Sequence, residues 1–114
     1  MTIRTILAAA ILLLSSACAL WNKPPDTIAY ACFPNAEAAN VFARYGMRKL
    51  IDFSEATGTG TGKTGLTIWT IGPNPCESGS VARLADNEDV YSSEEEALFR
   101  DAFLNALDSF RATH

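Results

Sequence analysis

The sequence is poor in the residues from which metal sites and catalytic groups are built. Its 114 residues include three cysteines and one histidine, the terminal His114. A structural zinc ion takes three or four Cys and His ligands, and a Ser or Cys nucleophile needs an adjacent base, most often a histidine. We therefore expect no metal ion, no cofactor and no residue with a catalytic role.

Basic charge is scarce as well. Nine Lys and Arg residues stand against thirteen Asp and Glu residues, which gives a net charge of −4. Nucleic-acid-binding proteins present a basic face, so we expect no nucleic-acid partner. Hydrophobic residues make up 48% of the chain and charged residues 19%. This balance is typical of a globular protein, and the length allows one domain.

The N-terminus has the order of residues found in export signals. Arg4 is the only charged residue before an unbroken run of nine apolar residues, Ile6–Leu14, and small residues follow this run. Nine residues rise about 14 Å as a helix, whereas the hydrocarbon core of a bilayer is about 30 Å thick. The run is too short to span a membrane, and its position predicts a cleaved signal peptide.

The segment Leu14-Ser15-Ser16-Ala17-Cys18 resembles the lipobox of bacterial lipoproteins. The resemblance implies that residues 1–17 are a lipoprotein signal peptide, removed by cleavage before Cys18. It also implies that Cys18 carries a diacylglyceryl group and an acylated N-terminus, with palmitate as a typical acyl chain. Ala19 is not the Asp that retains enteric lipoproteins in the inner membrane. The resemblance therefore points to the cell outer membrane, with the protein facing the periplasm.

A second cleavage site stays open as an alternative. Ala17-Cys18-Ala19 also fits the A-x-A site of the ordinary signal peptidase, which would cut before Leu20 and release a soluble periplasmic protein.

Removal of residues 1–17 leaves eight basic and thirteen acidic side chains. Because such a chain has no polybasic patch, its affinity for a lipid bilayer must come from acyl chains.

Either cleavage leaves Cys32 and Cys76 as the pair of cysteines outside the signal and its lipid-attachment residue. In an oxidising compartment, Cys32 and Cys76 are expected to form a disulfide bond, whereas in the cytoplasm they would stay free thiols. The bond would close a loop of 45 residues. Chain entropy then gives a stabilisation of up to about 4 kcal/mol. The spacing is not C-x-x-C, so a thiol–disulfide exchange enzyme is not expected.

Hydrophobic periodicity predicts one α+β domain. Residues 18–26, with Pro24-Pro25, are interpreted as a lipidated N-terminus and tether, and residues 27–114 as a single small domain. The expected order is β-α-β-β-(β)-α, a small antiparallel or mixed sheet of 3–4 strands with two helices. The predicted strands are Thr27–Phe33, Met47–Ser54, Leu66–Gly72 and a short edge strand Ser80–Leu84.

The two helices are predicted from their caps and apolar stripes. The first begins after the N-cap Asn35 and ends at Gly46. The second covers Ser92–Ala112, with Ser93 and Glu96 as a capping box. Its apolar stripe is expected to pack on the sheet, and Trp69 is expected in the core. The stripe consists of Phe99, Phe103, Leu107 and Phe110.

The Gly-Thr-rich segment Thr57–Thr64 approximates a P-loop without matching it. With Gly62-Lys63-Thr64 as the end of the motif, the first glycine belongs at position 57, where Thr57 stands. A β-rich sequence follows, whereas a P-loop needs a helix to direct N–H groups at the phosphates. We expect no nucleotide partner and interpret the segment as a hairpin loop between strands.

The acidic segment Asp86–Asp89 suggests calcium, but it fails as an EF-hand. A loop starting at Asp86 would need Gly at the position of Tyr91 and Glu at that of Ala97. A weak, irregular calcium site near Asp86, Glu88 and Asp89 stays open beside the interpretation of a solvated turn.

These observations predict an exported lipoprotein of the envelope that acts as a non-enzymatic binding or scaffolding module, with an envelope protein as a further partner. Two alternatives stay open. One is a soluble periplasmic binding or inhibitor domain released by cleavage after Ala19. The other is an enzyme that uses paired carboxylates, for example Asp52 with Glu55.

Overall fold

A computed structural model describes residues 27–114, and these residues form an α+β fold. The predicted signal peptide, tether and lipid-attachment residue Cys18 lie outside this part of the chain. The order β-α-β-β-α confirms the predicted class. The elements are β1 (Thr27–Phe33), α2 (Ala36–Thr57), β2 (Leu66–Trp69), β3 (Ser80–Asp86) and α3 (Ser93–Thr113).

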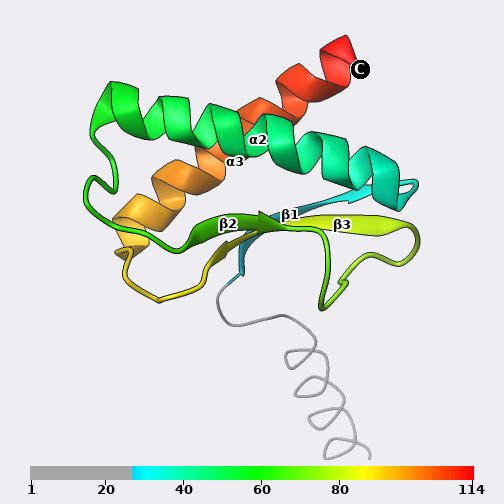
Figure 1. Cartoon of the computed structure of the whole chain (residues 1–114), viewed down its shortest axis with the longest axis horizontal. Helices are drawn as coiled ribbons and strands as arrows, with labels where there is room; N and C mark the ends of the chain where they lie inside the picture. The colour runs from blue at the N-terminus through cyan, green and yellow to red at the C-terminus, as the bar shows by residue number, and fades with distance from the viewer. Residues whose placement is uncertain (1–26) are drawn as a thin grey trace, which may run out of the picture.

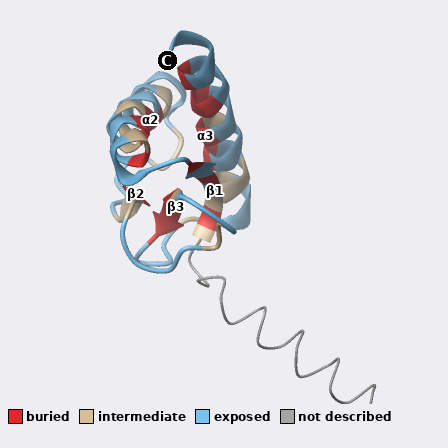
Figure 2. Ribbon diagram, turned by 90° about the vertical axis from the view of Figure 1, so that its right-hand side faces the viewer, coloured by how far each residue is buried: buried red, intermediate tan, exposed pale blue. Residues whose placement is uncertain are grey.

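The three strands (Figure 1) form an antiparallel sheet in the order β1-β3-β2 (Figure 2). The prediction that Ser80–Leu84 lies at an edge is therefore wrong, because β3 pairs with a strand on each side. All but the first of its seven residues are buried. Small side chains such as Ala82 and Ala85 give a weak strand signal, and pairing with both neighbours outweighs local propensity.

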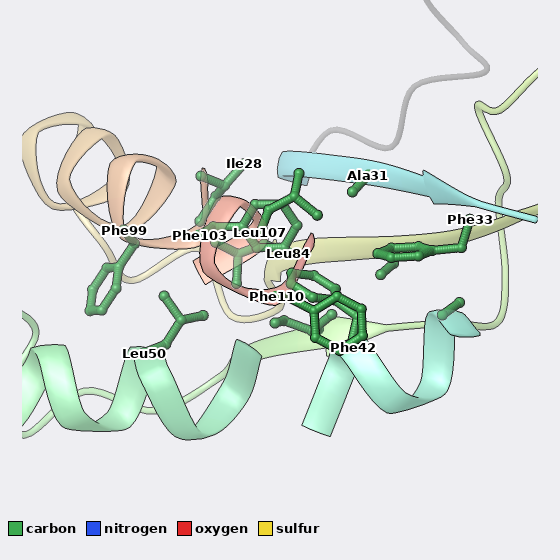
Figure 3. Packing of buried hydrophobic residues seen from close by; sticks show 13 residues of the cluster. Ile28, Ala31, Phe33, Phe42, Leu50, Leu84, Phe99, Phe103, Leu107 and Phe110 are labelled. Atoms are coloured by element: carbon green, nitrogen blue, oxygen red, sulfur yellow. The ribbon is translucent and has the colours of Figure 1, made fainter. Parts of the chain in front are cut away.

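Both helices cover the same face of the sheet, with α2 above β2 and α3 above β1 (Figures 1 and 2). The predicted aromatic stripe of α3 is buried there. Phe42 of α2 lies against two of its rings, with centroids 5.4 Å from Phe103 and 5.3 Å from Phe110 (Figure 3). Edge-to-face packing of this kind stabilises a core beyond the area it buries.

The first helix is twice as long as predicted, and this is the main correction to the expected fold. Residues 47–54 are helical and do not form the predicted strand, and Gly46 lies inside α2. The helix ends at Gly58, whose φ of 75° suits a glycine cap. A Cβ atom on Gly46 would come within 2.8 Å of the Ile68 side chain. Gly46 is thus suited to close helix–sheet packing.

The start of α3 differs from the prediction by one residue. Ser92, and not Ser93, is the N-cap, and its hydroxyl accepts a hydrogen bond from the backbone N–H of Glu95. The Glu95 carboxylate in turn accepts one from the N–H of Ser92, which completes a capping box. Within residues 27–114, no helix combines the length and apolar character needed to cross a membrane.

The predicted disulfide bond between Cys32 and Cys76 is present, with the two Cα atoms 5.9 Å apart. Cys32 pairs with Val81 across the sheet, so the bond attaches loop 70–79 beside the face that carries no helix. Trp69 also belongs to this face. It is half-buried, and its indole N–H donates to the side-chain oxygen of Asn87 at 2.9 Å. The prediction of Trp69 as a core residue is wrong, since the neighbouring Ile68 is the one that enters the core.

Candidate functional site

A groove lies between helix α2 and the edge strand β2, and we call it the α2–β2 groove. Its volume is about 670 Å³. Ligand sites in proteins commonly occupy about 300–1,000 Å³. The lining residues are Ala43, Arg44, Met47, Arg48, Ile51, Asp52 and Ile68.

Two contacts between α2 and β2 fix the shape of this groove. Gly46 brings the helix backbone close to Ile68, because it has no side chain to hold the two elements apart. At the end of β2, the Thr70 hydroxyl donates to the side-chain oxygen of Asn40 at 2.6 Å. Together these contacts place the face of α2 that lines the groove directly beside β2, the edge strand of the sheet.

The groove combines an apolar lining with a charged rim. Ala43, Met47 and Ile51 follow one another at intervals of four residues, so they form one row along α2. Ile51 is 51% exposed. Arg44, Arg48 and Asp52 form a second row beside the first, and all three side chains are exposed, so the rim is basic at its Arg44 end and acidic at its Asp52 end. Arginine pairs well with carboxylates through bidentate hydrogen bonds. The arrangement can therefore bind an apolar group that carries negative charge next to it.

The prediction from sequence missed this groove because it interpreted residues 47–54 as a strand. The spacing of Ala43, Met47 and Ile51 was the signal that could have revealed it, since such a row exists only if the helix continues past Gly46. Asp52 lines the groove, whereas Glu55, its suggested carboxylate partner, is exposed on α2 outside the lining.

The Gly-Thr-rich segment connects α2 to β2, so the prediction of a hairpin loop between two strands is wrong. The Lys63 ammonium forms an ion pair with Glu95 and lies 5.8 Å from the centre of the Tyr91 ring. A pocket of about 180 Å³ opens beside this ion pair, and Lys63 and Tyr91 contribute to its lining. The lysine of this segment is thus engaged in a contact with α3.

The contacts around Lys63 and Tyr91 accompany shifted pKa values of two side chains. Burial, followed by the nearby carboxylate of Asp86, raises the pKa of the Tyr91 phenol above its usual value. The hydrogen bond from Lys63 lowers the pKa of the Glu95 carboxyl, and hydrogen bonding with the Ser92 backbone acts in the same direction. Neither group lies in the α2–β2 groove.

The acidic turn after β3 is organised around a buried carboxylate. Asp86 is 2% exposed, so its assignment to a solvated turn is wrong. Its two oxygens accept hydrogen bonds from the backbone N–H groups of Val90 and Tyr91 at 3.3 and 3.0 Å. Glu88 accepts one from the Thr64 hydroxyl, and Asp89 is exposed. In residues 27–114, no group of three or more His, Cys, Asp or Glu side chains is arranged to hold a metal ion.

The C-terminal histidine is held against α3. The His114 ring stacks on Phe110 with centroids 4.2 Å apart, and its backbone N–H donates to the Phe110 carbonyl at 2.9 Å. A pocket of about 340 Å³ lies beside these rings and the disulfide residue Cys32.

Comparisons with protein-family models, with curated proteins and with solved structures gave no match to this chain. The site must therefore be interpreted from its own geometry.

Proposed function

We propose that this chain is a small exported lipoprotein of the bacterial cell envelope. Acyl chains on Cys18 hold it in the outer membrane, and residues 27–114 face the periplasm. There the domain acts as a non-enzymatic binding module through the α2–β2 groove. The leader and the lipobox-like segment support the anchor, and the apolar groove with its arginine rim supports the binding role.

The disulfide bond between Cys32 and Cys76 is the observation that carries the proposal. Disulfides persist in oxidising compartments such as the periplasm and are rare in the cytosol, where thiols are kept reduced. The bond joins residues 44 positions apart in the sequence. A small domain gains a substantial part of its stability from closing such a loop, which favours a protein that folds after export.

The anchor is tested by metabolic labelling with radioactive palmitate and by the mass of the mature N-terminus. We expect label in the wild-type protein, none in Cys18→Ser, and a mature chain that begins with a triacylated Cys18. Ala19→Ser is the matched control, because it changes the neighbouring residue and keeps the thiol. An unmodified chain that begins at Leu20 and leaves the cell on osmotic shock without detergent would contradict the lipid anchor and support the soluble periplasmic alternative.

A further inference from the structure

The edge strand β2 is open to pairing along the side that borders the α2–β2 groove. Among the residues that the structure describes, β2 pairs with β3 alone. An edge strand presents N–H and C=O groups to its surroundings, and these groups can add a further strand. Only the residues of β2 whose backbone groups point outward can pair with such a strand.

The hydrogen bonds between β2 and β3 show which residues of β2 point outward. The Asn87 N–H donates to the Gly65 carbonyl at 2.8 Å, and Leu66 lies opposite Asp86 in the same antiparallel register. In such a pair, residues that bond to the partner strand alternate with residues whose backbone groups point away. Counting from Gly65, Thr67 and Trp69 bond toward β3. Leu66 and Ile68 direct their N–H and C=O groups to the free edge.

The side chain of Ile68 lies on the helix-covered face and lines the groove. A residue that paired with Ile68 from an added strand would place its own side chain on the same face of the sheet. That side chain would enter the groove and contact Met47 and Ile51. The geometry thus selects an apolar residue at this position of an incoming strand.

The position of Arg44 along β2 predicts where an acidic side chain of an added strand would lie. Asn40 of α2 bonds Thr70 at the end of β2, and Gly46 lies over Ile68. The helix therefore runs antiparallel to β2, and Arg44 lies on the Thr70 side of the groove. In an added strand, the residue two positions from the apolar one returns to the same face. An acidic side chain there, toward Thr70, would meet the arginine rim.

We propose that β2 and the α2–β2 groove bind an extended peptide segment of another envelope protein. The segment adds a strand next to β2, buries an apolar side chain beside Ile68, and places a carboxylate near Arg44. A hydrocarbon chain would leave the outward backbone groups of β2 without partners, whereas a peptide pairs with them. This inference rests on the proposed binding role and does not depend on the lipid anchor.

The probe for this proposal is a displayed library of seven-residue peptides in which threonine alternates with randomised positions. It is selected on the mature protein as cells produce it, held in phospholipid nanodiscs. We expect enriched peptides with an apolar and an acidic residue two positions apart. Amide hydrogen exchange followed by NMR should show a rapidly exchanging Ile68 N–H in the free protein and a protected one with peptide, while Thr67 and Trp69 are protected in both states.

Charge reversals on α2 supply matched variants for the binding measurement. Arg44→Glu alters the rim, whereas Lys49→Glu makes the same change in charge elsewhere on α2, outside the groove lining. Fluorescence anisotropy with a labelled selected peptide should show affinity at least about tenfold weaker for Arg44→Glu and unchanged for Lys49→Glu. Ile51→Glu, at a half-exposed position, should abolish binding and leave the circular dichroism spectrum unchanged.

Several results would overturn the proposal. These are a library that yields no binder, a binder that leaves the Ile68 amide unprotected, equal losses in Arg44→Glu and Lys49→Glu, and binding of oleate without binding of peptide. Protection of Ile68 that rises with protein concentration alone would assign the edge to a second copy of the chain. Palmitate labelling plays no part here, so failure of the peptide experiment and failure of the lipid anchor are separate outcomes.

Discussion

Removal of the disulfide bond by the double substitution Cys32→Ser and Cys76→Ser should destabilise the domain markedly. The bond closes a loop whose ends are 44 positions apart. For 45 residues counted inclusively, the loss of loop-closure entropy in the unfolded chain amounts to about 4 kcal/mol at 25 °C. Cys32 is exposed and Cys76 is half-buried, so serine at these positions loses little packing. The effect should therefore come mainly from the unfolded state.

The assay is urea unfolding of the mature protein, followed by far-ultraviolet circular dichroism. We expect the free energy of unfolding to fall by about 2–4 kcal/mol, since strain and residual structure reduce the entropic value. The wild-type protein unfolded with a reductant should match the double variant, which controls for the serine side chains. A loss below about 1 kcal/mol, together with an intact bond in the wild-type mass spectrum, would refute the entropic reasoning.

Three further perturbations test the packing and the electrostatics. Phe103→Ala, at a side chain with 0% exposure, should cost about 3–5 kcal/mol in urea unfolding. The half-exposed Leu104→Ala should cost far less, and equal losses would contradict the assigned core. Gly79→Ala and Gly62→Ala both place Ala at a positive φ, but only at Gly79 would the new Cβ meet a β1 carbonyl oxygen, at 2.1 Å. A lower melting temperature for Gly79→Ala than for Gly62→Ala is expected, and the reverse order would contradict the loop geometry. The lowered pKa of Glu95 predicts a contribution to stability that is present above the unfolded-state pKa and is lost as pH falls through the folded-state pKa. Urea midpoints measured across this acidic range should fall less in Glu95→Gln than in the wild-type protein.

Patterns carried by single elements were predicted well from the sequence. Alternation and a closing proline located β1, and four apolar residues at helical spacing located the buried face of α3. The disulfide bond followed from parity, since a signal peptide that ends before Cys18 or after Ala19 leaves Cys32 and Cys76 as a pair. In each case the decisive information lies within one segment or in the count of residues.

The elements that were wrong depend on contacts between segments. Glycine is typical of a helix end, so Gly46 was interpreted as one. In the structure Gly46 lies inside α2, and its lack of a side chain allows close packing against Ile68, which lies 22 positions away. β3 holds the centre of the sheet although Arg83 interrupts its apolar sequence. Asp86 is buried because two backbone N–H groups of the following turn surround it. No local pattern contains these partners.

The α2–β2 groove could not be predicted for the same reason. It exists only because α2 continues past Gly46 and lies above an edge strand. The residues that form it had been divided between the end of a helix and a strand. Recognition of Ala43, Met47 and Ile51 as one helical row would have given one wall of the groove, but the other wall requires the strand order.

The most direct test of the account is the state of Cys18 in cells. Intact mass spectrometry of the mature protein, combined with palmitate labelling, measures it in one preparation. We predict a chain that begins at Cys18, carries three acyl chains, and loses label and membrane retention in Cys18→Ser. A chain that still begins at Met1, without lipid and with reduced Cys32 and Cys76, would contradict export, anchoring and the oxidised fold together.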